Sequence, residues 1–362
     1  MRTFPRRRTL PVLLGALVAV AAGGCGSPAG GGAPNGTGAA TTSAAPASPS
    51  APPRDITLEF AGDVHFTQRT AALLKDPATA FGPVATVLSQ ADLAMVNLET
   101  AVTERGTPQP KEFHFRAPAS AYQAIKAAGV DVVTVANNHV LDYGQVGLQD
   151  TIDNAKAAGV PIVGVGRNAS EAYAPWYTEI RGTKIAILAV SQVHELESTW
   201  KALDNRPGEA MASNVTRAAA AVAEARKHAD VVIMYVHWGH EGDQCPTSEM
   251  KTFAAKMAAA GADIVLGTHA HLLLGDGWLG KTYVQYGLGN FLWWWDDAFS
   301  NDTGVLRITL HDKKIAKTEL IPAEISRRTG QPIPSTGAEA ARIEKKYTGL
   351  HACTGLAAQP KS

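Results

Sequence analysis

Several short segments of the sequence combine histidine and carboxylate side chains at the spacing that a metal site requires. Asp63 and His65 are two positions apart, as are His269 and His271, so a tight turn can direct both members of a pair at one ion. Carboxylate oxygens and neutral imidazoles together suit divalent ions such as zinc, manganese and iron. The two pairs therefore predict a metal centre that draws on distant parts of the chain.

Three further strings contain residues of the same types, and their chemistry extends the prediction to two ions. They are Asn97-Leu98-Glu99, Asn137-Asn138-His139 and His237-Trp238-Gly239-His240-Glu241. Glu99 can bridge two ions through its two oxygens, and Asn138 offers a neutral carbonyl ligand. Two ions about 3.5–4 Å apart clamp an anionic substrate and lower the pKa of a bridging water. His139 is then free to act as a general acid or to stabilise developing charge.

Four more side chains are candidates for the same site. Asp142 either orients a histidine or belongs to a turn. Arg116 either pairs with a carboxylate or phosphate through its guanidinium fork or lies at the surface. We expect Glu241 to face the site. Trp293, which we place at an aromatic rim of the cleft, begins a run of three tryptophans that cannot all face the core of one strand; the alternative is packing between loops.

Short apolar runs precede these polar strings and predict the strands that position them. The runs cover residues 56–61, 93–98, 132–136, 161–165, 184–190, 231–236 and 264–266. Helical patterns lie between several of them, at residues 119–128, 146–158, 210–227 and 248–260. Continuous apolar strands that alternate with helices favour an α/β fold with helix-covered sheets, and such folds bind ligands at the carboxyl ends of the strands.

Three later runs, at residues 282–286, 304–310 and 315–321, have no helical pattern between them. They predict antiparallel additions that complete a sandwich of two sheets. We expect the domain to span residues 55–325, followed by a tail, residues 326–362, that packs on it. Cys245 and Cys353 either form a disulfide that fastens this tail to the domain or are two free thiols.

The first 25 residues predict an export signal, because basic residues precede an apolar segment that is too short to span a membrane. The string Ala22-Gly23-Gly24-Cys25 resembles a bacterial lipobox, in which the cysteine is acylated; the alternative is a plain secretory signal cleaved near Ala22. Residues 26–54 are mostly Gly, Ala, Pro, Ser and Thr and predict a flexible linker. We therefore expect an exported protein, lipid-anchored to the outer face of the bacterial cell membrane.

Seven strings together resemble the CapA family of capsule (poly-γ-glutamate) synthesis proteins, within the calcineurin-like metallophosphoesterase superfamily. They are FAGDVHF, MVNLET, FRAP, VANNHVLDYG, YVHWGHE, GTHAHLL and YGLGNFL, in the order of the family, over residues 60–292. The resemblance implies a four-layer α/β/β/α sandwich. It also implies that one ion is held by Asp63, His65, Glu99 and His271 and the other by Glu99, Asn138, His237 and His269. His139 takes the place of the catalytic histidine of the superfamily.

Composition and the resemblance together limit the function classes. Lys plus Arg and Asp plus Glu both number 33, so the formal net charge is zero and no nucleic-acid partner is expected. One class is a metal-dependent hydrolase or transferase acting outside the membrane on a phosphoester or on an anionic polymer such as poly-γ-glutamate. A phosphodiesterase or phosphatase unrelated to that polymer is a variant of this class. The other class is a non-catalytic, polymer-binding part of a synthesis or export assembly.

Overall fold

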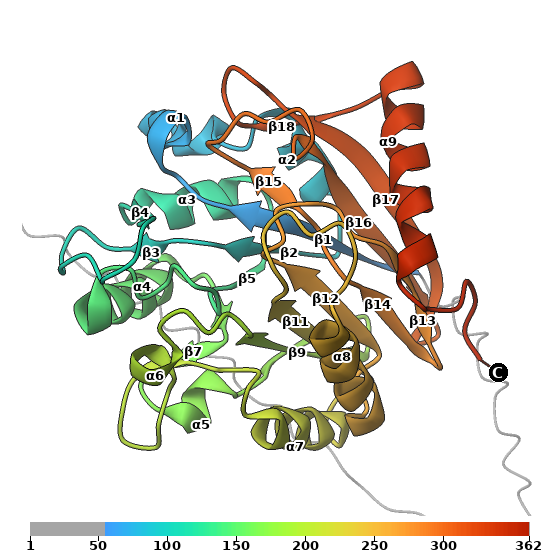
Figure 1. Cartoon of the computed structure of the whole chain (residues 1–362), viewed down its shortest axis with the longest axis horizontal. Helices are drawn as coiled ribbons and strands as arrows, with labels where there is room; N and C mark the ends of the chain where they lie inside the picture. The colour runs from blue at the N-terminus through green and yellow to red at the C-terminus, as the bar shows by residue number, and fades with distance from the viewer. Residues whose placement is uncertain (1–54, 362) are drawn as a thin grey trace, which may run out of the picture. The chain divides into compact units, whose positions relative to one another are not determined.

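The computed structural model describes residues 55–361, in which most strands belong to two large β-sheets (Figure 1). The predicted export signal, the predicted acylation of Cys25 and the predicted linker fall on residues outside this range. Among the described residues, no helix has both the length and the apolar character needed to cross a membrane.

The first sheet combines parallel N-terminal strands with C-terminal strands that pair antiparallel with one another. Its order is β18 (Pro332–Pro334), β17 (Lys314–Ile325), β16 (Asp302–His311), β1 (Ile56–Val64), β2 (Leu93–Leu98), β5 (Val132–Thr134) and β6 (Ile162–Val163), with β15 (Asn290–Leu292) paired to β1. Strands β1, β2, β5 and β6 run parallel, whereas β16 pairs antiparallel with both β1 and β17. The predicted antiparallel additions at residues 304–310 and 315–321 are confirmed.

The second sheet has a parallel centre and antiparallel edges. Its order is β13 (Asp276–Leu279), β14 (Thr282–Gln285), β12 (Ile264–Thr268), β11 (Val231–His237), β9 (Thr183–Ser191) and β8 (Trp176–Ile180). Strand β14 is antiparallel to β13 but parallel to β12, so the prediction for residues 282–286 is only partly right. The reason is β13, which runs antiparallel to β14, so the chain has reversed direction twice between β12 and β14. Two strand pairs lie apart: β3 (Ala101–Val102) with β4 (Arg116–Ala117), and β7 (Val165–Gly166) with β10 (Gly208–Glu209).

Helices cover the outer faces of both sheets, and the C-terminal helix contacts both sheets. The longer ones are α3 (Ser120–Ala127), α4 (Gly144–Ala158), α7 (Val215–Arg226), α8 (Ser248–Ala260) and α9 (Gly337–Leu350). The short ones are α1 (Gln68–Ala71), α2 (Ala85–Leu88), α5 (Ala169–Ala172), α6 (Glu197–Trp200), η1 (Ala72–Lys75), η2 (Pro77–Thr79), η3 (Gly82–Val84) and η4 (His351–Cys353). The predicted helix at 210–227 begins only at Val215, because the Asn214 side chain accepts a hydrogen bond from the Arg217 amide and caps the helix there.

Helix α8 illustrates how the sequence produces these covering helices. The Thr247 hydroxyl accepts a hydrogen bond from the Met250 amide 3.2 Å away, and Gly261 ends the helix in the left-handed conformation. Its buried residues recur three and four positions apart and make one apolar face, consisting of Met250, Phe253, Ala254 and Met257. That face packs on the second sheet together with α7 (Figure 1).

Three apolar layers separate the four layers of secondary structure. One lies between the first sheet and helices α2, α3 and α4, one between the two sheets, and one between the second sheet and helices α7 and α8. Alternation along β11 shows the division: Val231, Ile233 and Tyr235 face the first sheet, whereas Val232, Met234 and Val236 face the helices. The predicted four-layer α/β/β/α sandwich is therefore confirmed.

Candidate metal centre

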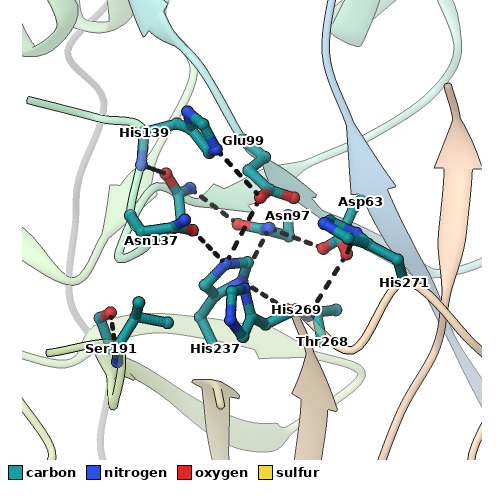
Figure 2. A network of polar contacts seen from close by, with 12 residues as sticks. Asp63, Asn97, Glu99, Asn137, His139, Ser191, His237, Thr268, His269 and His271 are labelled. Carbon is teal, nitrogen blue, oxygen red and sulfur yellow. Dashed lines mark hydrogen bonds and ion pairs between the residues drawn. The ribbon is translucent and has the colours of Figure 1, made fainter. Parts of the chain in front are cut away.

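The layer between the sheets changes from apolar to polar at the carboxyl ends of the strands. On β2 the inward positions of Leu93 and Met95 continue to Asn97, and on β11 those of Ile233 and Tyr235 continue to His237. Parallel strands end at one edge of a sheet, so side chains that follow them meet there. Figure 2 shows the resulting cluster, which contains Asp63, Asn97, Glu99, His139, His237, His269 and His271.

A bulge in β1 turns Asp63 into this cluster. The pairing of β1 with β2 shifts register between Phe60 and Asp63, which brings Asp63 opposite Asn97. Gly62 permits the close approach of a neighbouring turn, since a Cβ there would lie 1.8 Å from the Gly289 carbonyl oxygen. The Asn97 carboxamide donates to Asp63 Oδ1 over 2.8 Å, and the His269 amide donates to Oδ2 over 3.3 Å. These two hydrogen bonds orient the Asp63 carboxylate.

His269 and His271 adopt backbone conformations that few residues other than glycine adopt. Their φ angles are 88° and 58°, on the left-handed side of the map. Such strain persists only where the surrounding structure imposes it, and it gathers at functional sites. The bend after β12 brings the two imidazole rings to 5.9 Å between centroids and places His271 Nδ1 3.4 Å from Asp63 Oδ2.

Three overlapping groups of side chains have the geometry to hold a cation. They are Asp63, Glu99 and His271; Glu99, His237 and His269; and Glu241, His269 and His271, and the ligand atoms within each group lie within 4.8 Å of one another. Glu99 belongs to the first two groups, as a bridging ligand requires. Both of its carboxylate oxygens are buried without a hydrogen-bond partner, as is Nδ1 of His269. A buried carboxylate without a partner is costly, so these residues fit a divalent ion.

The electrostatics of the cluster are set by burial and by charges within it. Burial, together with the nearby Asp63 charge, raises the pKa of Glu99 well above its usual range. Burial lowers the pKa of His237 to about 3, and burial with two neighbouring imidazoles holds the pKa of His269 well below normal. Burial also opposes the charge on His271, but the contact with Asp63 and the charge of Glu99 raise its pKa to about 9. A bound cation would stabilise the ionised carboxylates and neutral imidazoles that ligation needs.

Asparagine and threonine side chains orient His237. Its Nε2 lies 2.9 Å from Asn138 Oδ1 and 3.5 Å from Glu99 Oε1, while its Nδ1 lies 3.0 Å from Thr268 Oγ1. Asn138 therefore has its oxygen beside the same imidazole nitrogen that faces Glu99. Asn97 Nδ2 is 3.2 Å from His237 Nδ1, so this residue links Asp63 to His237 rather than facing the cavity. Polar groups of this kind fix the ring orientation and tautomer of a metal-binding histidine.

His139 lies on the other side of Glu99 and is held by Asp142. Its Nε2 is 3.9 Å from Glu99 Oε1 (Figure 2). Its Nδ1 is 2.6 Å from Asp142 Oδ2. Asp142 thus contacts a histidine, which was one of its two predicted roles. Burial raises the pKa of Asp142 to about 7, against the opposing charge of Lys111. Burial and the charge of Lys111 also keep the pKa of His139 well below normal.

Lys111 is a site residue that the sequence interpretation missed. Its side chain is only 2% exposed, and its ammonium group lies 3.1 Å from Asp142 Oδ1 and 3.3 Å from Glu195 Oε2. It also donates to the backbone carbonyl of Asn138. The sequence offered little to identify Lys111, because it lies in a polar loop and no apolar run directly precedes it.

His65 lies beside the cluster, but it belongs to none of the three ligand groups found among the described residues. Its ring stacks on Phe115 at 4.5 Å between centroids, and Phe115 stacks on His139 at 3.9 Å. Both ring nitrogens of His65 are buried without a hydrogen-bond partner. The pairing of His65 with Asp63 on one ion stays a prediction.

A cavity of about 420 Å³ opens onto the cluster, and its lining includes His139, His271, Glu241 and Trp293. Glu241 Oε1 is 3.8 Å from His271 Nε2, and Trp293 packs against His271 with ring centroids 4.4 Å apart. Arg116 does not line this cavity: its guanidinium lies over the Tyr143 ring, 3.3 Å from the centroid. The structure thus places Glu241 and Trp293 in the lining of the cavity and Arg116 elsewhere. Trp293 is a buried part of the wall, so its predicted place at an exposed rim is wrong.

Cys245 and Cys353 form a disulfide, with Cα atoms 5.8 Å apart. The bond joins the loop that follows Glu241 to the turn after α9. Helix α9 packs through Ile343 and Tyr347 on an apolar cluster that includes Leu320 of β17. The Tyr347 hydroxyl lies 2.8 Å from Gln285 Oε1 on β14, so the C-terminal helix contacts both sheets.

Comparisons with known proteins agree with this architecture. The chain is 28% identical over 298 residues to the PGA biosynthesis protein CapA of Bacillus subtilis, covering 81% of this chain and 78% of that protein. It is also 28% identical to the capsule biosynthesis protein CapA of Bacillus anthracis, covering 77% and 70%. A hypothetical protein from Thermus thermophilus shares the fold, with a TM-score of 0.50, 17% identity and coverage of 74% of this chain and 99% of that one. Residues 57–293 match the family described as bacterial capsule synthesis protein PGA_cap, and the chain belongs to that family.

Proposed function

We propose that this chain serves the synthesis or export of an anionic capsule polymer as a metal-dependent hydrolase or transferase that acts on a phosphoester. The single observation that carries the proposal is Glu99, a fully buried carboxylate with no hydrogen-bond partner between Asp63, His139 and His237. The names of the relatives, which refer to PGA and capsule biosynthesis, support the process. Proteins of polymer synthesis and export are its expected partners.

Two divalent ions, of manganese, iron or zinc, are the proposed cofactors. Asp63, Glu99 and His271, with His65 as predicted, would hold one ion, and Glu99, Asn138, His237 and His269 would hold the other. Such a pair of ions polarises phosphoryl oxygens and makes water a stronger nucleophile. The carboxylate, imidazole and carboxamide donors fit manganese, iron or zinc, whereas calcium and magnesium prefer oxygen ligands alone.

His139 is the proposed proton carrier. The Asp142 carboxylate accepts from Nδ1–H and leaves Nε2 free on the side of Glu99 and the cavity. From Nε2 the ring can take up a proton and return it to the leaving group. Lys111 neutralises Asp142 on its other oxygen and holds the backbone of Asn138, so it positions both residues.

We also propose that the domain works outside the cell membrane, on a tether that begins at an acylated Cys25. The motif around Cys25 and the composition of residues 26–54 support this location. Replacement of Cys25 by alanine should release the protein from membranes into the soluble fraction. Retention of the variant in the membrane fraction would count against acylation.

The metal proposal is tested on the purified full chain reconstituted with Mn²⁺. We expect elemental analysis to find about two ions per chain and metal-dependent hydrolysis of bis(p-nitrophenyl) phosphate, with poly-γ-glutamate assayed in parallel. The Glu99→Gln variant should bind no ions and should not hydrolyse the phosphodiester, because the substitution removes the carboxylate that the two ion sites share. Glu179→Gln, at an exposed position on β8, is the matched control. A Glu99→Gln protein that keeps its ions and its rate contradicts the proposal.

A further inference from the structure

The outer wall of the cavity above the metal centre is aromatic. Across the described residues, the exposed phenylalanine and tryptophan side chains are Phe113, Trp295 and Phe299, with exposed fractions of 49%, 57% and 43%. All three line this one cavity, as does the half-buried Trp294, and we name these four residues the aromatic rim. Large apolar side chains that gather at one opening are typical of a ligand-binding or interaction surface.

The polar groups of the same cavity are rich in hydrogen-bond acceptors. Glu241 and Asp297 contribute carboxylates. The carboxamide oxygen of Asn290 is buried without a hydrogen-bond partner, although Asn290 also lines the cavity. Among the described residues that form this lining there is neither a lysine nor an arginine. These groups favour a part of the ligand that donates hydrogen bonds and carries no negative charge.

A sugar ring has both properties that this wall requires. Its hydroxyl groups donate to carboxylate and carboxamide oxygens, and its C–H face packs on aromatic rings, whose faces carry partial negative charge. A chain of glutamates fits poorly, because it would bring further carboxylates towards Glu241 and Asp297, and the described lining has neither a lysine nor an arginine to pair them.

The cavity is continuous with the metal centre, since His139 and His271 belong to its lining. We infer that the substrate is a glycosyl phosphate, with its phosphate at the metal centre and its sugar on the aromatic rim. This inference rests on the proposed phosphoester chemistry and names the substrate class for it. The rim supplies the sugar specificity, and the metal centre supplies the affinity for phosphate.

The test measures binding, so it does not depend on turnover. The full chain carrying His139→Ala is loaded with Mn²⁺ and titrated by calorimetry with glucose 1-phosphate, glycerol 3-phosphate, adenosine 5′-monophosphate and inorganic phosphate. We expect glucose 1-phosphate to bind about tenfold more tightly than glycerol 3-phosphate, the size of one good stacking contact. Trp295→Ala with Phe299→Ala should remove this advantage and leave the affinity for inorganic phosphate unchanged.

Tyr177→Ala is the matched control, because Tyr177 is 44% exposed on β8 and outside the lining of this cavity. Equal affinities for the two phosphates, or an equal loss for every ligand in the double variant, would overturn the inference. A clear preference for adenosine 5′-monophosphate or for poly-γ-glutamate over glucose 1-phosphate would overturn it as well.

Methyl α-glucoside separates the failure of the rim from the failure of the metal chemistry. This ligand has no phosphate, so it should quench tryptophan fluorescence in the metal-free chain, and Trp295→Ala with Phe299→Ala should abolish the change. Quenching without any binding of inorganic phosphate would refute the proposed phosphoester function and leave the rim as a sugar site. Binding of inorganic phosphate without quenching by the glucoside would refute the sugar site at the rim and leave the proposed phosphoester function standing.

Discussion

Glu99 and Asp302 are both buried carboxylates, yet among residues 55–361 only Asp302 has hydrogen-bond partners. Asp302 Oδ2 accepts from Arg342 Nη1 over 2.9 Å and from Lys346 over 2.7 Å, whereas neither oxygen of Glu99 has a hydrogen-bond partner. Burial opposes ionisation at both positions, but the bonds from Arg342 and Lys346 lower the pKa of Asp302 while that of Glu99 rises. A satisfied buried charge belongs to the framework, and an unsatisfied one is built for a ligand.

The comparison implies that substitutions near Glu99 should lower the rate of hydrolysis, whereas substitutions near Asp302 should lower the free energy of unfolding.

The largest effect is expected at His139. His139→Ala should lower the hydrolysis rate by about 10²–10⁴-fold, the usual contribution of general acid–base catalysis, and should keep the ions. Rate measurements with elemental analysis of the same sample check both halves. An unchanged rate would remove His139 from the mechanism.

The next largest effect is the response of stability to metal. Because the ion binds the folded chain, Mn²⁺ at 100 times its dissociation constant should raise the free energy of unfolding by about 2.7 kcal/mol. Glu99→Gln should abolish this gain, yet its metal-free form should be at least as stable as the parent, because the buried charge is gone. Denaturant titrations with and without Mn²⁺ give both values. A metal-free variant much less stable than the parent would mean that Glu99 serves the framework after all.

A smaller loss is expected at Asp142, which acts through His139. Asp142→Asn should reduce the rate by about 10–100-fold, as changes to the partners of site residues commonly do, with metal content preserved. The loss should fall mainly on kcat and leave KM nearly unchanged, since Asp142 is outside the lining of the substrate cavity. Steady-state kinetics with the phosphodiester would test this division. A large rise in KM alone would indicate a general distortion of the loop.

The smallest effect is expected for Asp302→Asn, which should lower the free energy of unfolding by about 1–2 kcal/mol at pH 7, because Arg342 is half-exposed and solvent weakens the pair. The rate should not change. Since the folded-state pKa of Asp302 is lowered, its contribution is present above the usual carboxyl range and is lost as the pH falls below about 4. Denaturant titrations of parent and variant should therefore converge at low pH. A constant difference would show that the charge of Asp302 is not the cause.

The site residues at the ends of strands were predictable from the sequence. Side chains alternate between the two faces of a strand, and this alternation directs Asn97 and His237 into the layer between the sheets. The α/β class was predictable because apolar runs and helical patterns alternate along the chain, whereas the four-layer arrangement was predicted from the family resemblance. Lys111 was not, because a loop residue carries no periodic signal and its partner Asp142 is distant in the chain. Helix α9 was also missed, since Ile343 and Tyr347 are its only buried residues and make too narrow an apolar face.

The left-handed backbone at His269 and His271 is held by contacts within the protein, including the bond from the His269 amide to Asp63 Oδ2. The conformational cost of the bend is met during folding, so an arriving ion need not order the loop and its affinity is not reduced by that cost. Exchange of one divalent ion for another likewise requires no rearrangement of the loop. The order of affinity among divalent transition metals is nearly the same at all sites with nitrogen and oxygen ligands, so affinity alone does not select one metal. The metal content of the protein should therefore reflect the supply in its compartment.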